Sequence, residues 1–314
     1  MAAAPPAPVT DPGAAFPELD ALRRRLAAGD VTGTLAQLAA VGRRHGPDEA
    51  VARELLAADP RTGPVLERHL AAAPDDGAAR VLLAHHHLVA ASAAPTGPTG
   101  PSEPTVSAED ARALVDRAEA ALLRRCAEEP ADTEARALRI RTAALGGLPP
   151  GEAHRRYLRL FALDAHHVVG QRAYLDSLLP PQGSWDAALA FARTVAAAAP
   201  PGSSEVGLLA TVHLLHWRAG EAGARAPLRD AALLTELEDV ADRLRAVRSR
   251  ARWADVEAHT TLAVLFGVAG VDDRAATHLR ALGPVVAPGP WAALGRHLPD
   301  LEHLRATVLA EGGA

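Results

Sequence analysis

The spacing of apolar residues constrains this chain more than any other feature. Between successive Pro and Gly residues the sequence runs in segments of about 12–20 residues, in which apolar side chains recur with the period of an α-helix. The apolar–polar alternation typical of β-strands is nearly absent. We therefore predict an all-α fold. The expected helices cover 17–28, 31–44, 47–58, 61–73, 76–92, 107–128, 131–145, 150–163, 166–179, 184–199, 203–219, 228–250, 254–269, 271–282 and 290–311.

Residues 233–247 illustrate this periodicity. Leu233, Leu237 and Leu244 fall on one face of the expected helix, whereas Glu236 falls away from it. A helix with one apolar stripe needs a neighbour to cover that stripe. We expect this segment to form one wall of a stack of helices.

A second pattern repeats every 35 residues. Small residues recur at this step at Ala118, Ala153 and Ala188, and larger residues follow the same step close behind. The larger pairs are Leu122 with Tyr157 and Leu123 with Leu158; Pro130 and Pro200 lie two steps apart. A unit of this length is a helical hairpin, which buries its apolar stripe only by stacking on the next hairpin.

The chain resembles the tetratricopeptide family, whose unit of about 34 residues reads W-x2-L-G-x2-Y, then A-x3-F, then P. The matching run is His259-x2-Leu262-Ala263-x2-Phe266, followed by Ala275-x3-Leu279 and Pro288. His259 stands at the Trp position and Ala263 at the Gly position, so the repeats are degenerate. The resemblance implies a tetratricopeptide-like stack of antiparallel helix pairs, an α-solenoid.

Other runs resemble an uncharacterised bacterial family, a domain of unknown function with tetratricopeptide-like helices. These runs are residues 181–193, 199–203 and 68–80. That family has no established activity, so the resemblance implies a fold and no mechanism.

The expected domain organisation is a disordered tail over residues 1–16 and a single helical-repeat domain over 17–314. The tail lacks the basic and apolar regions of a secretory signal. Residues 93–106 are rich in Pro, Gly, Ser and Thr, which is typical of a loop or a linker between domains. We favour a loop inside one helical hairpin, because 76–92 and 107–128 match the two helices of a unit.

Composition excludes several classes of partner. The net charge of −5 argues against a nucleic-acid binder, and no apolar stretch is long enough to span a membrane. The chain has no Lys or Asn and one Ile, which is typical of a very GC-rich bacterial genome, so its many Arg residues are not a nucleic-acid signal. With Cys126 as the only cysteine, no disulfide framework is possible, and we expect a cytoplasmic protein.

The histidines are the strongest candidates for metal chemistry. His85–His87 are consecutive on a helix and point in different directions, as do His166 and His167, so neither set can chelate one ion. His213 and His216 have suitable spacing for two ligands, but no third ligand lies nearby in the sequence. We interpret these two as packing with Trp217 between helices, and we predict no metal and no cofactor.

The densest basic run contains Arg245, Arg248 and Arg252, which would share one helix face. Such a face can contact phosphate groups. We favour a solvated outer face whose Arg residues pair with neighbouring acidic residues.

We find no catalytic set of residues, so the chain is more an interaction module than an enzyme. The leading hypothesis is a scaffold that binds a peptide or a partner protein on a concave surface of its first helices. Those helices are 131–145, 166–179, 203–219 and 254–269, and the candidate surface residues are His213, His216, Trp217, Arg245, Arg248 and Arg252. The alternative is an enzyme or enzyme subunit that acts on a small molecule in a pocket near His213, His216 and Trp217.

Overall fold

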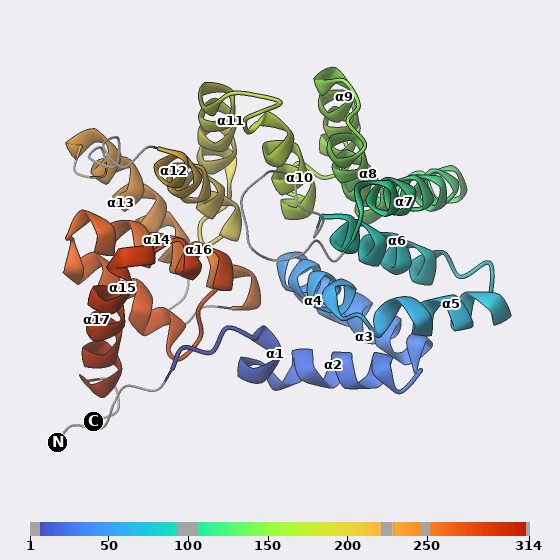
Figure 1. Ribbon diagram of the computed structural model, residues 1–314, viewed down its shortest axis with the longest axis horizontal. Coiled ribbons are helices and arrows are strands. Elements are labelled where there is room, and N and C mark those ends of the chain that lie inside the picture. The colour runs from blue at the N-terminus through green and yellow to red at the C-terminus, as the bar shows by residue number, and fades with distance from the viewer. Residues whose placement is uncertain (1–6, 93–105, 221–227, 229, 246–251, 312–314) are drawn as a thin grey trace. The chain divides into compact units, whose positions relative to one another are not determined.

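The computed structural model describes residues 7–92, 106–220, 228, 230–245 and 252–311. Within these ranges the chain forms seventeen α-helices and no β-strand, which confirms the prediction of an all-α fold (Figure 1). None of the helices in the described part is both long and apolar enough to cross a membrane. The helices form two compact units. The N-terminal unit spans 17–184, and the C-terminal unit combines 7–16 with 185–311.

Helices of the N-terminal unit begin and end close to the predicted positions. They are α2 (Pro17–Ala27), α3 (Val31–Arg44), α4 (Gly46–Ala58), α5 (Thr62–Ala72), α6 (Gly77–Ser92), α7 (Ala108–Glu128), α8 (Thr133–Leu145), α9 (Pro150–Phe161) and α10 (Val168–Leu178).

Short polar side chains cap the N-termini of several of these helices. The Asp132 carboxylate accepts a hydrogen bond from the backbone N–H of Ala135 at 2.9 Å, and the Ser107 hydroxyl accepts one from Asp110 at 3.0 Å. Each bond satisfies a backbone donor that the first turn of a helix cannot satisfy internally. The cap residues therefore set where α8 and α7 begin.

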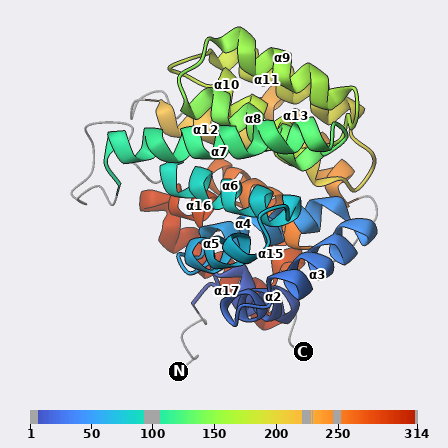
Figure 2. The ribbon, with the colours of Figure 1, turned by 90° about the vertical axis from the view of Figure 1, so that its right-hand side faces the viewer.

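Consecutive helices of this unit pack as pairs, and alternate helices also touch. Helix α7 lies alongside α6 and α8, as Figure 2 shows, and α8 packs on both α9 and α10. One core is shared by α6, α7 and α8, and its buried residues are Val81, Ala84, Leu88, Ala91, Val115, Ala118, Leu122, Ala135 and Leu138. The predicted loop over 93–106 lies outside the described residues except for Val106. The helices that flank it nevertheless share this core.

The C-terminal unit contains the remaining helices. They are α1 (Pro12–Ala15), α11 (Trp185–Ala198), α12 (Gly207–Ala219), α13 (Ala231–Arg245), α14 (Val256–Ala269), α15 (Asp272–Leu282), α16 (Pro288–Ala292) and α17 (Leu298–Glu311). The single helix predicted over 290–311 is instead two helices, α16 and α17, separated by a 3-10 turn at Gly295–His297. Gly295 has a φ of +52°, a backbone conformation that cannot continue an α-helix.

Residues 7–16, which the sequence assigns to a disordered tail, belong to the C-terminal unit. The backbone N–H of Val9 donates to the carbonyl of Pro284 at 2.9 Å, and Val286 donates back to Val9 at 3.0 Å. Phe16 packs beside Trp253, with 6.0 Å between ring centroids. Both the backbone pairing and the aromatic contact involve residues far away in the chain, so no local pattern reveals them.

The chain divides into two compact units, and the single domain over 17–314 stays a prediction. The boundary falls between Ser184 and Trp185, just after Pro180, Pro181 and Gly183. These residues interrupt the helical pattern.

Candidate functional site

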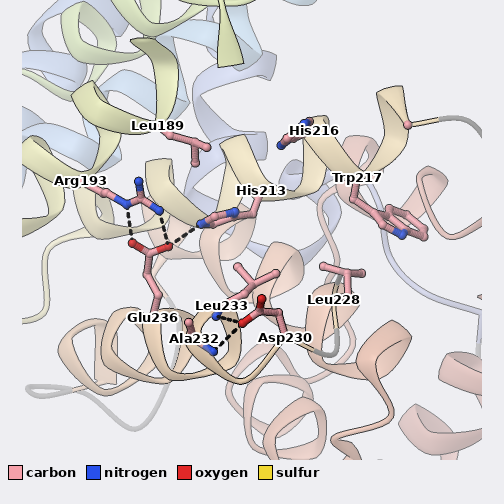
Figure 3. A pocket seen from close by; sticks show the side chains of 11 residues that line it. Leu189, Arg193, His213, His216, Trp217, Leu228, Asp230, Ala232, Leu233 and Glu236 are labelled. Carbon is pink, nitrogen blue, oxygen red and sulfur yellow. Dashed lines mark hydrogen bonds and ion pairs between the residues drawn. The ribbon is translucent and has the colours of Figure 1, made fainter. Parts of the chain in front are cut away.

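A cavity of about 680 Å³ lies in the C-terminal unit among α11, α12 and α13 (Figure 3). Its volume is within the range of about 300–1,000 Å³ typical of ligand pockets. The lining residues are Leu189, Arg193, His213, His216, Trp217, Gly220, Leu228, Asp230, Ala232, Leu233 and Glu236.

Helical spacing turns these side chains toward the cavity. Leu189 and Arg193 lie one turn apart on α11, and so do His213 and Trp217 on α12. Each pair therefore occupies one face of its helix, and the faces meet where the helices pack together.

A close approach between two helices positions α12. Gly207, its first residue, lies so near α14 that an added Cβ atom would be 2.5 Å from the Cβ of Ala258. Only glycine fits at this position, so α12 packs tightly on the core of the unit.

The polar side of the cavity is a group of three side chains centred on Glu236. Arg193 donates through Nε to Oε1 of Glu236 at 2.6 Å and through a terminal nitrogen to Oε2 at 3.2 Å. His213 Nε2 lies 2.8 Å from Oε2 of the same carboxylate. Arg193 and Glu236 thus form a two-point ion pair, and His213 is attached to it.

Burial and hydrogen bonding set the charges of this group. Burial lowers the pKa of His213 despite the nearby carboxylate, so the imidazole is neutral near pH 7. The hydrogen bond from Arg193 lowers the pKa of Glu236, which stays ionised. An ionised carboxylate only accepts hydrogen bonds, so the proton of neutral His213 is on Nε2 and its Nδ1 carries a lone pair.

The other end of the cavity is aromatic and apolar. His216 is exposed and stacks on Trp185, with 4.7 Å between ring centroids and 19° between planes. Trp217 is buried. Asp230 uses its carboxylate to cap α13, accepting from the backbone of Ala232 at 2.7 Å.

The structure brings together three of the six predicted surface residues. His213, His216 and Trp217 line one cavity. Arg245 does not line it; it ends α13 and binds Asp242 at 2.6 Å. Arg252 has extended backbone and precedes a separate turn, so it does not share a helix face with Arg245. Arg248 lies outside the described residues.

Sequence reasoning missed Arg193 and Glu236, the ion pair to which His213 is attached. Glu236, the partner of His213, is 23 positions away from it on α13, outside the stretch of sequence in which a ligand beside His213 is expected. The available signal was an acidic residue that falls away from the apolar face of its helix. Arg193 gave no signal of its own.

The cavity offers binding groups but no hydroxyl, thiol or amine nucleophile among its described lining residues. None of its lining residues in the described part of the chain is Ser, Thr, Cys, Tyr or Lys. In the same described residues, no group of three or more His, Cys, Asp or Glu side chains could hold a metal ion. The chemistry that the charged group offers is hydrogen bonding at His213 and Arg193, and the polarisation of a ligand or a water by the neutral imidazole.

The N-terminal unit holds the other predicted histidines. His85 is buried and binds Glu54 through Nε2 at 2.7 Å, whereas His86 and His87 are half-buried. His166 and His167 line a separate polar cavity of about 470 Å³. The first turns of α4, α8 and α10 surround it, and α8 and α10 are two of the helices predicted to carry a binding surface.

Comparisons with protein-family models, with curated proteins and with solved structures found no match to this chain. The site must therefore be interpreted from its own geometry.

Proposed function

We propose that this chain is a non-catalytic protein-interaction module that binds a peptide, or a segment of a partner protein, in the cavity among α11, α12 and α13. The observation that supports this most is the chemistry of that cavity. Its walls are largely apolar, Arg193 and Glu236 pair with each other, and Asp230 caps α13. Such a site favours an apolar guest with a few polar groups.

The architecture we propose is a degenerate tetratricopeptide-like stack of helix pairs. The burial pattern supports the 35-residue step. Ala118, Ala153 and Ala188 are all buried, whereas Leu123 and Leu158, one step apart, are 47% and 50% exposed. Equivalent positions thus have equivalent environments, as stacked hairpins require.

Packing between alternate helices supports the same architecture. In the N-terminal unit α4 touches α6, α6 touches α8, and α8 touches α10. In the C-terminal unit α12 touches α14. Contacts between the first helices of successive pairs are what a helical-repeat stack needs. We further propose a cytoplasmic location in a bacterial cell, in keeping with a single cysteine.

The alternative is an enzyme or enzyme subunit that acts on a small molecule in the same cavity. The observation in its favour is the pairing of Glu236 with His213, which leaves Nδ1 of a neutral imidazole able to accept a proton. The cavity volume also suits a small molecule. This is the second choice because the Glu236 carboxylate is already held by Arg193 and His213, and that of Asp230 caps α13.

Selection from a random peptide display library on the full chain tests the main proposal. We expect peptides that bind the wild type and lose binding to the Leu233→Arg variant, because Leu233 lines the cavity. Leu234→Arg is the matched control: it is the next residue on the same helix, is also half-buried, and does not line the cavity. It should bind the same peptides as the wild type.

Two results would contradict the proposal: no enriched peptide at all, or enriched peptides that bind Leu233→Arg as well as the wild type. Native mass spectrometry after incubation with a pool of bacterial metabolites addresses the alternative. A small molecule retained by the wild type and by Leu234→Arg, but not by Leu233→Arg, would favour the enzyme hypothesis.

A further inference from the structure

The hydrogen-bonding groups of the cavity are only partly used. Both oxygens of Glu236 accept bonds from Arg193 or His213. In the described residues no protein group donates to Nδ1 of His213, and the third guanidinium nitrogen of Arg193 points away from Glu236 (Figure 3). The site therefore has one unused acceptor, at Nδ1, and unused donors at Arg193.

The charges of the cavity leave no place for an ion. Arg193 neutralises Glu236, and His213 is neutral. The carboxylate of Asp230 is held at the start of α13, where the backbone N–H groups stabilise it. An anionic guest would enter a site with no free positive charge, and a cation would compete with the backbone N–H groups of α13 for Asp230, whereas a neutral polar guest meets neither problem.

A neutral guest that has both a donor and an acceptor matches these unused groups. The backbone amides on the two sides of one amino-acid residue supply an N–H and a carbonyl oxygen. The leucine-lined wall formed by Leu189, Leu228 and Leu233 suits an aliphatic side chain between those amides.

Resting on the function proposed above, we propose that the cavity binds an uncharged stretch of peptide through one aliphatic residue. The peptide N–H donates to Nδ1 of His213, a peptide carbonyl accepts from Arg193, and the side chain packs on the three leucines.

Binding of this kind depends on the protonation state of His213. Protonation would turn Nδ1 into a donor and remove the acceptor that the peptide N–H needs. The charged and titratable groups around the ring are Arg193 on α11, His216 on α12, and Asp230 and Glu236 at α13. Glu236 holds Nε2 in both states, so the change occurs at Nδ1.

The direct test uses N-acetyl-leucinamide as the probe and the full chain labelled for NMR at Leu methyl groups. We expect chemical-shift changes at Leu189, Leu228 and Leu233 and not at Leu234. N-acetyl-glycinamide, which has no side chain, should bind at least about 10-fold more weakly, because burial of a leucine side chain contributes most of the affinity. The charged N-acetyl-glutamate amide should not bind.

Two variants separate the hydrogen bond from shape. His213→Phe keeps a ring but has no acceptor, so its affinity for N-acetyl-leucinamide should be about 5-fold lower than that of the wild type. His213→Gln keeps a donor for Glu236 and an acceptor for the probe, and should bind nearly as well as the wild type. On titration from about pH 7.5 down to about pH 4.5, the wild type should lose affinity and His213→Gln should not. Circular dichroism at each pH monitors the fold.

Three results would overturn the inference: equal affinity for the leucine and glycine probes, equal affinity of His213→Phe and the wild type, or preference for the charged probe. If library peptides still depend on Leu233 while any of these holds, the proposed function stands and only this ligand chemistry fails. If no peptide and no probe binds the cavity, the proposed function fails as well.

Discussion

Two buried imidazoles in the C-terminal unit share one hydrogen bond. Nδ1 of His259 lies 2.8 Å from Nδ1 of His278, and the ring of His278 stacks on Phe266. One of the two nitrogens must carry a proton and the other a lone pair, so two neutral rings would hold opposite tautomers. Burial is the main cause that lowers the pKa of His259, to about 4, and that of His278 well below its usual value.

This pair should make the folding of the unit sensitive to acid. Between about pH 6.5 and pH 4 the unfolded chain binds protons that the folded pair excludes, so the free energy of unfolding is highest above pH 6.5 and falls as the pH drops. For His259 alone the loss reaches about 3 kcal/mol. Urea unfolding at a series of pH values measures it. The double variant His259→Leu/His278→Phe should show a clearly smaller pH dependence; an unchanged slope would contradict this assignment.

Small residues at the 35-residue step have a packing role that substitution can test. Ala118 in α7 is fully buried, whereas Ala127 on the same helix is exposed. We expect Ala118→Leu to cost about 1–3 kcal/mol of stability through overpacking. Ala127→Leu, the matched control, should change stability by less than about 0.5 kcal/mol. If both variants lost the same stability in thermal unfolding, close packing would not explain the small residue at position 118.

At the scale of elements, a polar network joins three helices of the N-terminal unit. Glu119 of α7 binds Arg139 of α8 at 2.9 Å and Arg156 of α9 at 3.0 Å. Arg156 is buried and also binds Glu152 at 2.6 Å and the hydroxyl of Thr142 at 2.9 Å. The network joins α7, α8 and α9, because Glu119 of α7 binds one arginine from each of the other two helices.

Two adjacent arginines allow a matched test of this network. Arg156→Leu removes the one buried cation that binds both Glu119 and Glu152 and should cost about 3 kcal/mol, the range expected when a buried ion pair is broken. Arg155 is exposed and, among the described residues, pairs with Glu152 alone, so Arg155→Leu should cost less than about 1 kcal/mol. Chemical denaturation of both variants gives the comparison. If Arg156→Leu proved as mild as Arg155→Leu, the network would not hold the helices together.

At the scale of the whole molecule, the two units carry different spectroscopic signals. All four Trp residues, Trp185, Trp217, Trp253 and Trp291, belong to the C-terminal unit, and both Tyr residues belong to the N-terminal unit. Tryptophan fluorescence therefore reports unfolding of the C-terminal unit alone, whereas circular dichroism reports helices of both.

Residues 7–16 should stabilise the C-terminal unit although 168 residues separate them from the rest of it. Phe16 packs with Val256, Leu282 and Val285. Phe16→Ala should cost this unit about 1–3 kcal/mol and shift the fluorescence-detected midpoint to lower denaturant. Leu138→Ala, in the core of the N-terminal unit, is the control: it should shift the midpoint seen by circular dichroism more than that seen by fluorescence. An unshifted fluorescence midpoint for Phe16→Ala would rule out the predicted role of the segment.

Local patterns in the sequence were sufficient for the helices and for part of the site. The spacing of apolar residues placed α2–α12, α14 and α15 to within a few residues, because backbone hydrogen bonds and caps form between residues at most four or five positions apart. The same spacing grouped His213, His216 and Trp217 on one face of α12, and they do line one cavity.

Only the tertiary structure decided which helices line that cavity and which charged residues lie beside His213. Glu236 and Arg193 reach His213 from α13 and α11, and Phe16 reaches Trp253 from the other end of the chain. Such contacts depend on how helices cross, which many small packing terms determine together. The residues that make such contacts do not recur at a fixed spacing in the sequence. The sequence by itself therefore determined the helices and one wall of the site, and the packing of the C-terminal unit determined the rest.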